Sequence, residues 1–251
     1  MYLVKNHFEF IEAKSARRFG SGINMSKDQG LQKSQAPTPR GPGRPPKQPR
    51  WGDAGLDPEK QHRLRREALF RTAAKAFNEF GFYTTTVDDL AKRLNVTKPT
   101  LYYYAKDKDA ILFECQKMAF DYISDALEEV ENGPESGMQK LKDFLHRYAE
   151  LMANDYGACL IITGLKPLRA ESQVQLRGFA RQLDQALQKV LAQGIKDGTI
   201  RSCNIRLTAY LIFGAFNNIA NWYRPDGEFT IEYISDYFLG MIMRSLQPEG
   251  A

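Results

Sequence analysis

Residues 84–105, TTTVDDLAKRLNVTKPTLYYYA, constrain the fold more than any other part of the chain. Thr86 and Asp89 have the spacing of a capping box, which predicts the start of a helix. The apolar residues that follow repeat at helical spacing and form one buried stripe: Val87, Leu90, Ala91 and Leu94. After a three-residue break, a shorter helix begins at Thr97, since Pro99 is tolerated only in a first turn. Two short helices joined by a tight turn are predicted to form a helix-turn-helix unit.

The rest of the chain also has helical periodicity. Asp57 and Pro58 form a good helix start, and Gly81 ends that first helix. After the helix-turn-helix unit, breaks at Gly, Pro and Asn divide the apolar pattern into further predicted helices, near 109–131, 138–154, 158–167, 170–197, 204–223 and 229–246. No segment requires a strand, so the predicted fold class is all-α.

Charge and composition divide the chain into three parts. The first 108 residues hold 21 Lys and Arg against 11 Asp and Glu, whereas the rest hold 14 against 19. We expect a disordered, basic, Pro-rich tail over 1–57, because such a segment cannot bury apolar surface. A helix-turn-helix domain is expected over 58–108 and a larger helical domain over 109–251. The basic front end indicates a polyanion as partner, although a solvated basic tail without a partner has the same composition.

Several classes of protein are disfavoured. Cys115, Cys159 and Cys203 are widely separated, as are the three histidines, so neither a disulfide framework nor a metal site is expected. No phosphate-binding glycine loop and no paired nucleophile and base are found, so we expect no catalytic residues, no cofactor and no enzyme. The longest apolar stretch, 210–216, is far shorter than the roughly 20 residues of a membrane span. A cytoplasmic protein is expected.

The second helix of the helix-turn-helix unit is the expected DNA-reading element. In such units this helix enters the major groove, and its N-terminal residues reach the base edges. Here these residues are Thr97, Lys98, Pro99 and Thr100. Tyr103 and Tyr104 add phenolic donors and apolar surface, and Lys108 is suited to a phosphate. An ordinary helical hairpin in an all-α protein is the alternative interpretation.

Residues 68–112 resemble the N-terminal domain of the TetR family of bacterial repressors. The resemblance rests on residues at fixed spacing: Ala74, Phe77, Phe80, Gly81, Thr85, Thr86, Leu90, Ala91, Val96, Thr100, Leu101, Tyr102 and Lys108. Two positions depart from the family pattern. Asn95 replaces the usual glycine and tolerates the same left-handed turn, and Ala105 replaces a frequent Phe.

The resemblance implies roles for individual residues. Thr85 and Thr86 are implied to contact phosphate. The residues implied to face the groove are Lys98, Pro99, Thr100 and Tyr103. Those implied to contact the DNA backbone are Tyr102, Tyr104 and Lys108. For Tyr104 two roles stay open: contact with phosphate and packing against the protein interior.

By the same resemblance, 109–251 is a ligand-binding and dimerisation domain. The last two helices, expected within 205–225 and 230–246, are implied to form a homodimer, as palindromic operators require. A mostly apolar effector pocket is expected from small, aromatic and amide residues, the candidates being His146, Cys159, Thr163, Phe179, Phe213, Asn217, Asn221 and Trp222. Each of these residues also suits an ordinary core.

The effector and the tail leave alternatives open. WYRPDG, 222–227, and the acidic helix after it look like a TetR branch that responds to acyl-CoA or related thioesters. Whether effector releases or promotes DNA binding is open, and a ligand-independent, nucleoid-associated DNA-binding protein is the alternative function. In the tail, 40–47 partly resembles an AT-hook, so Arg40, Arg44 and Lys47 are candidate minor-groove residues or a plain basic linker. Met25 is a candidate alternative translation start.

Overall fold

The computed structural model describes residues 57–248, and in this range every regular element is an α-helix. The all-α fold class is therefore confirmed. The helices are α2 (Pro58–Phe80), α3 (Val87–Arg93), α4 (Lys98–Tyr104), α5 (Lys108–Asn132), α6 (Gly137–Ala153), α7 (Asp155–Thr163), α8 (Ala170–Lys196), α9 (Ile205–Asn217), α10 (Ile219–Trp222) and α11 (Ile231–Leu246). The AT-hook-like stretch and Met25 lie outside the described residues.

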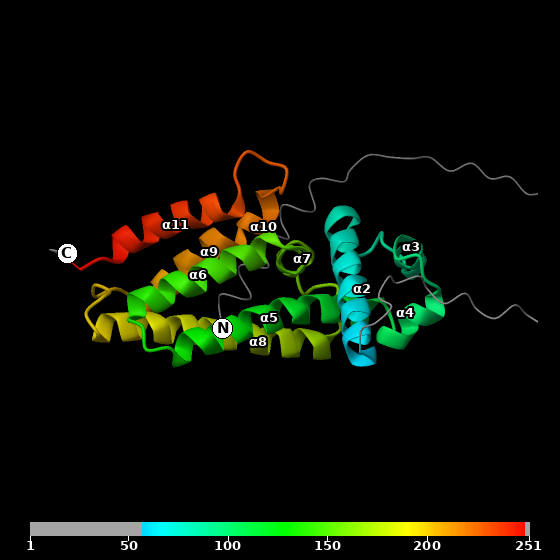
Figure 1. Cartoon of the computed structure of the whole chain (residues 1–251), viewed down its shortest axis with the longest axis horizontal. Helices are drawn as coiled ribbons and strands as arrows, with labels where there is room; N and C mark the ends of the chain where they lie inside the picture. Colours follow the sequence, from blue (N-terminus) through cyan, green and yellow to red (C-terminus); the bar gives the residue numbers. More distant parts are fainter. Residues whose placement is uncertain (1–56, 249–251) are drawn as a thin grey trace, which may run out of the picture.

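The three N-terminal helices form a unit at one end of the molecule. In Figure 1, α2 stands across the end of a long helical body, and α3 and α4 lie on its outer side. Phe70 and Phe77 of α2 are fully buried, as are Leu90 of α3 and, almost completely, Leu101 of α4. α2 packs against α5 and α7 on the body side and against α3 on the other. The recognition helix α4 is thus attached to the body through α2 and the start of α5.

The body is built around α6. This helix packs against α5, α7, α8 and α11, and its buried face includes Leu141, Phe144, Leu145 and Tyr148. The last helices, α9 to α11, run along the opposite side from α5 (Figure 1). Among the described residues, no helix is long and apolar enough to cross a bilayer.

Two segments differ from the predicted helices. α7 begins at Asp155 rather than near 158, because the Asn154 side chain accepts hydrogen bonds from the backbone of Tyr156 and Gly157 and caps an earlier turn. It ends at Gly164, whose φ of +66° is left-handed, so residues 164–169 form a turn instead of helix. The predicted helix 204–223 is divided into α9 and α10 at Asn218.

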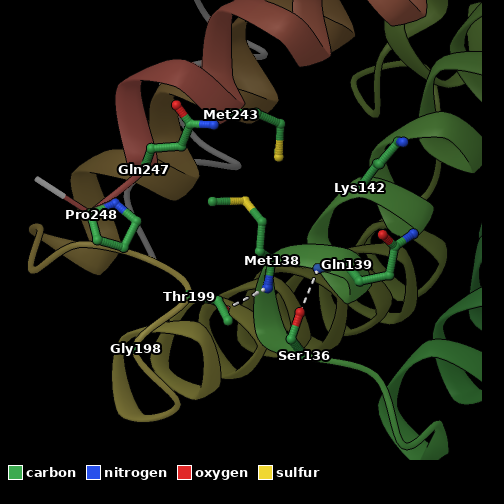
Figure 2. A pocket seen from close by; sticks show the side chains of 9 residues that line it. All are labelled: Ser136, Met138, Gln139, Lys142, Gly198, Thr199, Met243, Gln247 and Pro248. Carbon is green, nitrogen blue, oxygen red and sulfur yellow. Dashed lines mark hydrogen bonds between the residues drawn. The ribbon is translucent and has the colours of Figure 1, made fainter. Parts of the chain in front are cut away.

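The start of α6 touches the backbone of α8. A Cβ placed on Gly137 would lie 2.1 Å from the backbone nitrogen of Gly194, so the two helices approach closely enough to exclude a side chain. The first amides of α6 are satisfied by the α8–α9 turn: Gly137 donates to Asp197 (2.7 Å) and Met138 to Thr199 (3.1 Å; Figure 2). This contact fixes the far end of the body.

Candidate nucleic-acid interface

The capping box at the start of α3 is present as predicted. The Asp89 backbone donates to the Thr86 hydroxyl (3.2 Å), and the Thr86 backbone donates to the Asp89 carboxylate (3.0 Å). Hydrogen bonds from the Thr86 side chain and backbone hold the pKa of Asp89 below its usual value. Thr86 itself is exposed, so it lies where a phosphate can approach the N-terminus of α3.

The turn between α3 and α4 uses a left-handed residue. Asn95 has a φ of +52°, and it is the one non-glycine residue with positive φ in the described part of the chain. The predicted tolerance of asparagine at the family's glycine position is therefore confirmed. Leu101, 1% exposed, anchors α4 beneath this turn, which leaves the opposite side of α4 facing outward.

The outward side of α4 carries most of the predicted DNA contacts. Tyr103 is 74% exposed and Tyr102 is 48% exposed. The hydroxyls of Thr97 and Thr100 are hydrogen-bonded to each other at 3.0 Å. These side chains and the N-terminus of α4 together present hydrogen-bonding groups and aromatic surface to solvent.

Lys98 is paired within the unit. Its Nζ lies 2.8 Å from the Asp88 carboxylate of α3, and this hydrogen bond raises the pKa of the lysine. Both side chains are about half exposed, so the pair is open to competition by another anion. Lys98 can exchange Asp88 for a base or phosphate, at the cost of this ion pair.

Tyr104 packs inward rather than outward. Its ring stacks on His62 of α2 with centroids 5.2 Å apart, and Tyr103 meets both rings edge-on. Partial burial raises the pKa of Tyr104. Of its two predicted roles, packing is the one seen here, and His62 supports the C-terminal end of α4.

Thr85 and Lys108 do not have the outward-facing positions that their expected contacts with phosphate would need. Thr85 is 3% exposed, and its hydroxyl donates to the Gly81 carbonyl at 2.8 Å. Lys108 donates to the carbonyls of Phe82 (2.8 Å) and Thr85 (3.0 Å) and lies over the Phe82 ring. Both side chains bind backbone of the loop before α3, so they hold the unit together rather than project toward DNA.

The predicted effector residues lie in separate groups within the body. His146 of α6 has its Nδ1 3.0 Å from the Ser235 hydroxyl of α11 and its Nε2 3.8 Å from the Asp236 carboxylate. Asn217 accepts a short hydrogen bond from the buried Tyr148 hydroxyl. Tyr148 also meets Phe213 edge-on. The structure therefore brings Phe213 and Asn217 together on one tyrosine between α6 and α9.

The remaining candidates are distributed over other helices. Cys159 and Thr163 are neighbours on α7, and burial raises the pKa of the Cys159 thiol to about 12. Phe179 of α8 packs against Phe120 of α5. Trp222 is 43% exposed and lies against Phe238 of α11, and Asn221 is exposed next to it.

Sequence reasoning missed Gln116 of α5. It is fully buried, donates from Nε2 to the Gly164 carbonyl (2.8 Å), and leaves Oε1 buried without a hydrogen-bond partner in residues 57–248. The local sequence pattern does not predict that Gln116 is buried, because a glutamine in an amphipathic helix normally faces solvent. An unsatisfied buried acceptor can receive a donor from a bound molecule.

Comparison with known families decides the class of this protein. The family described as "Bacterial regulatory proteins, tetR family" matches residues 69–115, and "Tetracyclin repressor-like, C-terminal domain" matches 134–246. The two matches cover the helix-turn-helix unit and the body in the expected order. The chain belongs to the TetR family. It is accordingly a DNA-binding transcriptional regulator, and the partners expected from its sequence, operator DNA, an effector and a second copy, are those of TetR regulators.

Individual TetR relatives are similar over most of this chain. The fatty acid metabolism regulator protein of Bacillus subtilis (strain 168) is 25% identical over 195 residues, covering 74% of this chain and 98% of the relative. The TetR regulator PfmR of Thermus thermophilus superposes with a TM-score of 0.65 and 25% identity, covering 72% and 99%. AibR in complex with isovaleryl coenzyme A and operator DNA has a TM-score of 0.62 and 23% identity, covering 70% and 97%.

Two of the hollows on the described part of the TetR body are lined in part by α6. One, of about 450 Å³, lies at the end of the body far from α4. Figure 2 shows Met138 and Met243 on two sides of it. It is lined by Ser136, Met138, Gln139, Lys142, Gly198, Thr199, Met243, Gln247 and Pro248. The other, about 320 Å³, lies along α5 and α6 and includes His146 among mostly charged residues. Of the eight predicted effector residues, His146 alone lines either of these two hollows.

Proposed function

We propose that this TetR-family protein is a repressor that reads a palindromic operator through α4. The residues assigned to the groove are Thr97, Lys98, Pro99, Thr100 and Tyr103, and those assigned to the DNA backbone are Thr86 and Tyr102. The observation that carries the proposal is the exposed polar side of α4, set on a capped α3 and anchored by Leu101. Residues 58–108 form the DNA-binding domain in this proposal, and 109–251 the effector and dimerisation domain.

Lys98→Ala is expected to reduce discrimination among operators. A side-chain contact to a base edge contributes about 1–3 kcal/mol of preference for the correct base. The assay uses a panel of operators, each altered at one base pair. We expect the variant to lose its preference for the correct base at one position of each half-site, so that operators altered there bind about as tightly as the unaltered operator. Fluorescence anisotropy at fixed salt measures the effect.

The matched control is Lys75→Ala. Lys75 also forms an ion pair on a helix surface, with Glu79 at 3.9 Å, but it lies on α2 outside the proposed contact set. Its relative affinities are expected to match those of the unaltered chain. Unchanged relative affinities in Lys98→Ala would refute base reading by this lysine.

The alternative is a nucleoid-associated protein that binds DNA without regard to sequence or ligand. Basic residues concentrated toward the N-terminus support such binding as well. Selection from random DNA separates the two functions. A palindromic footprint supports the repressor, whereas affinity that depends on salt but not on sequence supports the alternative.

We further infer that the chain is not an enzyme. His146 lies between Ser235 and Asp236, which is the order of a hydrolytic triad. Ser235, however, is 3% exposed in the second turn of α11, so its hydroxyl is not open to a substrate. These contacts join α6 to α11.

The proposed effector is hydrophobic, and acyl-CoA is the first class to test. In this proposal, binding of the effector makes the protein release its operator. The name of the Bacillus relative concerns fatty acid metabolism, and AibR, which has a similar fold, has been crystallised in complex with isovaleryl coenzyme A and operator DNA. In this chain the buried amide of Gln116 offers an acceptor, and Tyr148, Phe213 and Asn217 form a mixed aromatic and polar group.

Long-chain acyl-CoA is expected to stabilise the protein and to weaken operator binding. Ligand at 100 times its dissociation constant raises the free energy of unfolding by about 2.7 kcal/mol. Thermal unfolding with palmitoyl-CoA, palmitate and free coenzyme A measures the first effect, and anisotropy of labelled operator the second. No shift in melting with any of the three would exclude this effector class.

A further inference from the structure

The turn from Gly164 to Arg169, which we term the strap, connects α7 to α8 and crosses the start of α5. Leu165 and Leu168 fix its middle in the core, at 6% and 4% exposed. At its first residue, the Gly164 carbonyl accepts the hydrogen bond from buried Gln116. The strap is therefore tied into the body at one end.

At the other end, Arg169 binds two acidic residues at the start of α5. Its backbone N–H donates to Asp109 at 2.7 Å, and its Nε donates to the same carboxylate at 3.1 Å. Its Nη2 donates to Asp107 at 3.0 Å. Three hydrogen bonds, two of them from one guanidinium, make this a geometrically specific contact.

Lys108, which lies between the two acids, contacts the DNA-binding unit instead of the strap. Lys108 donates to the carbonyls of Phe82 and Thr85, which belong to the DNA-binding unit. Three consecutive side chains, Asp107 to Asp109, therefore hold the strap on one side and the α2–α3 loop on the other. α4 ends at Tyr104, three residues earlier, so this junction sets where α4 lies relative to the body.

We propose that Arg169 is a positioning residue for DNA binding: through Asp107 and Asp109, the strap holds α4 at the spacing that an operator requires. The inference rests on the proposed reading of DNA by α4. Without the guanidinium, Asp109 keeps the Arg169 backbone N–H and the Ser172 hydroxyl, but the strap loses Asp107, so a smaller fraction of molecules has α4 in place. Apparent affinity falls in proportion to that fraction.

The test compares Arg169→Ala with Arg177→Ala in the full-length chain. Arg177 lies on α8 and is exposed, and its one side-chain hydrogen bond within residues 57–248 is to Gln173 of the same helix, so it matches the loss of charge. We expect Arg169→Ala to bind a palindrome selected with the unaltered chain about tenfold more weakly, with faster hydrogen exchange in residues 98–104. Arg177→Ala should change neither quantity. If the unaltered chain selects no palindrome, the proposed function fails before the strap is tested.

A conservative variant separates positioning from general stability. Arg169→Lys keeps a cation that can reach one carboxylate but loses the two-donor fork, so it is expected to bind the operator within about threefold of the unaltered chain. Recovery supports the proposal even if Arg169→Ala lowers the melting temperature. An Arg169→Lys variant no better than Arg169→Ala, or an Arg169→Ala affinity equal to that of Arg177→Ala, would overturn it.

Discussion

Gly137→Ala is expected to destabilise the protein by about 3 kcal/mol, because a methyl group added at this position has no space to occupy. The added Cβ would lie 2.1 Å from the nitrogen and 2.3 Å from the Cα of Gly194. Both atoms are backbone, so no side chain can rotate away, and α6 must separate from α8. Separation also weakens the hydrogen bonds from Gly137 to Asp197 and from Met138 to Thr199. Urea unfolding followed by circular dichroism measures the loss.

The control is the same substitution at Gly178, within α8. Nothing lies within 4 Å of a Cβ at this position, and alanine is favoured over glycine in a helix by about 0.5–1 kcal/mol. Gly178→Ala is therefore expected to stabilise the chain. Equal free energies of unfolding for the two variants would show that α6 and α8 do not approach as described.

Leu207→Glu with Leu211→Glu is expected to abolish dimer formation and to weaken operator binding by at least about 100-fold. Both leucines are more than 60% exposed and lie one helical turn apart on α9. Tyr233, Tyr237 and Met241 form a similar exposed row on α11. Such contiguous apolar surface is typical of an interface. A dimer binds two half-sites jointly, and loss of the joint binding costs a factor of about 10²–10⁴.

Val174→Glu is the matched control for this pair. Val174 of α8 is 66% exposed and aliphatic, but it lies outside the two proposed dimer helices. Sedimentation of the control should report a dimer and sedimentation of the double variant a monomer. A dimeric double variant would place the interface on another surface.

Much of the fold was predictable because its signals are local. The capping box at Thr86 and the left-handed turn at Asn95 are read from neighbouring residues, and Pro99 limits where α4 can begin. Caps that compete with the apolar pattern were harder to predict. The pattern predicts a helix over 158–167, but the Asn154 side chain starts α7 earlier and Gly164 ends it earlier.

The interface was less predictable, because what an exposed polar residue binds depends on distant segments. Thr85 and Thr86 are adjacent in sequence, yet Thr85 is buried against the end of α2 and Thr86 is exposed. Lys108 follows a recognition helix, where a phosphate contact is the simplest expectation, but carbonyls 23 and 26 residues earlier occupy it. Arg169, 60 residues after Asp109, has no sequence signal that links it to α4.

The alternation of Asp107, Lys108 and Asp109 has a consequence for building chimeric regulators. Exchanging DNA-binding domains between TetR proteins requires a fusion point, and the short stretch between α4 and α5 is an obvious choice. A fusion made there separates α4 from Lys108, whose contacts with the Phe82 and Thr85 carbonyls belong to the DNA-binding unit, so the lysine would then come from a different protein than its partners. A fusion made after Ala110 transfers the lysine and both acids together with α4, and the acceptor body then needs an arginine where this chain has Arg169.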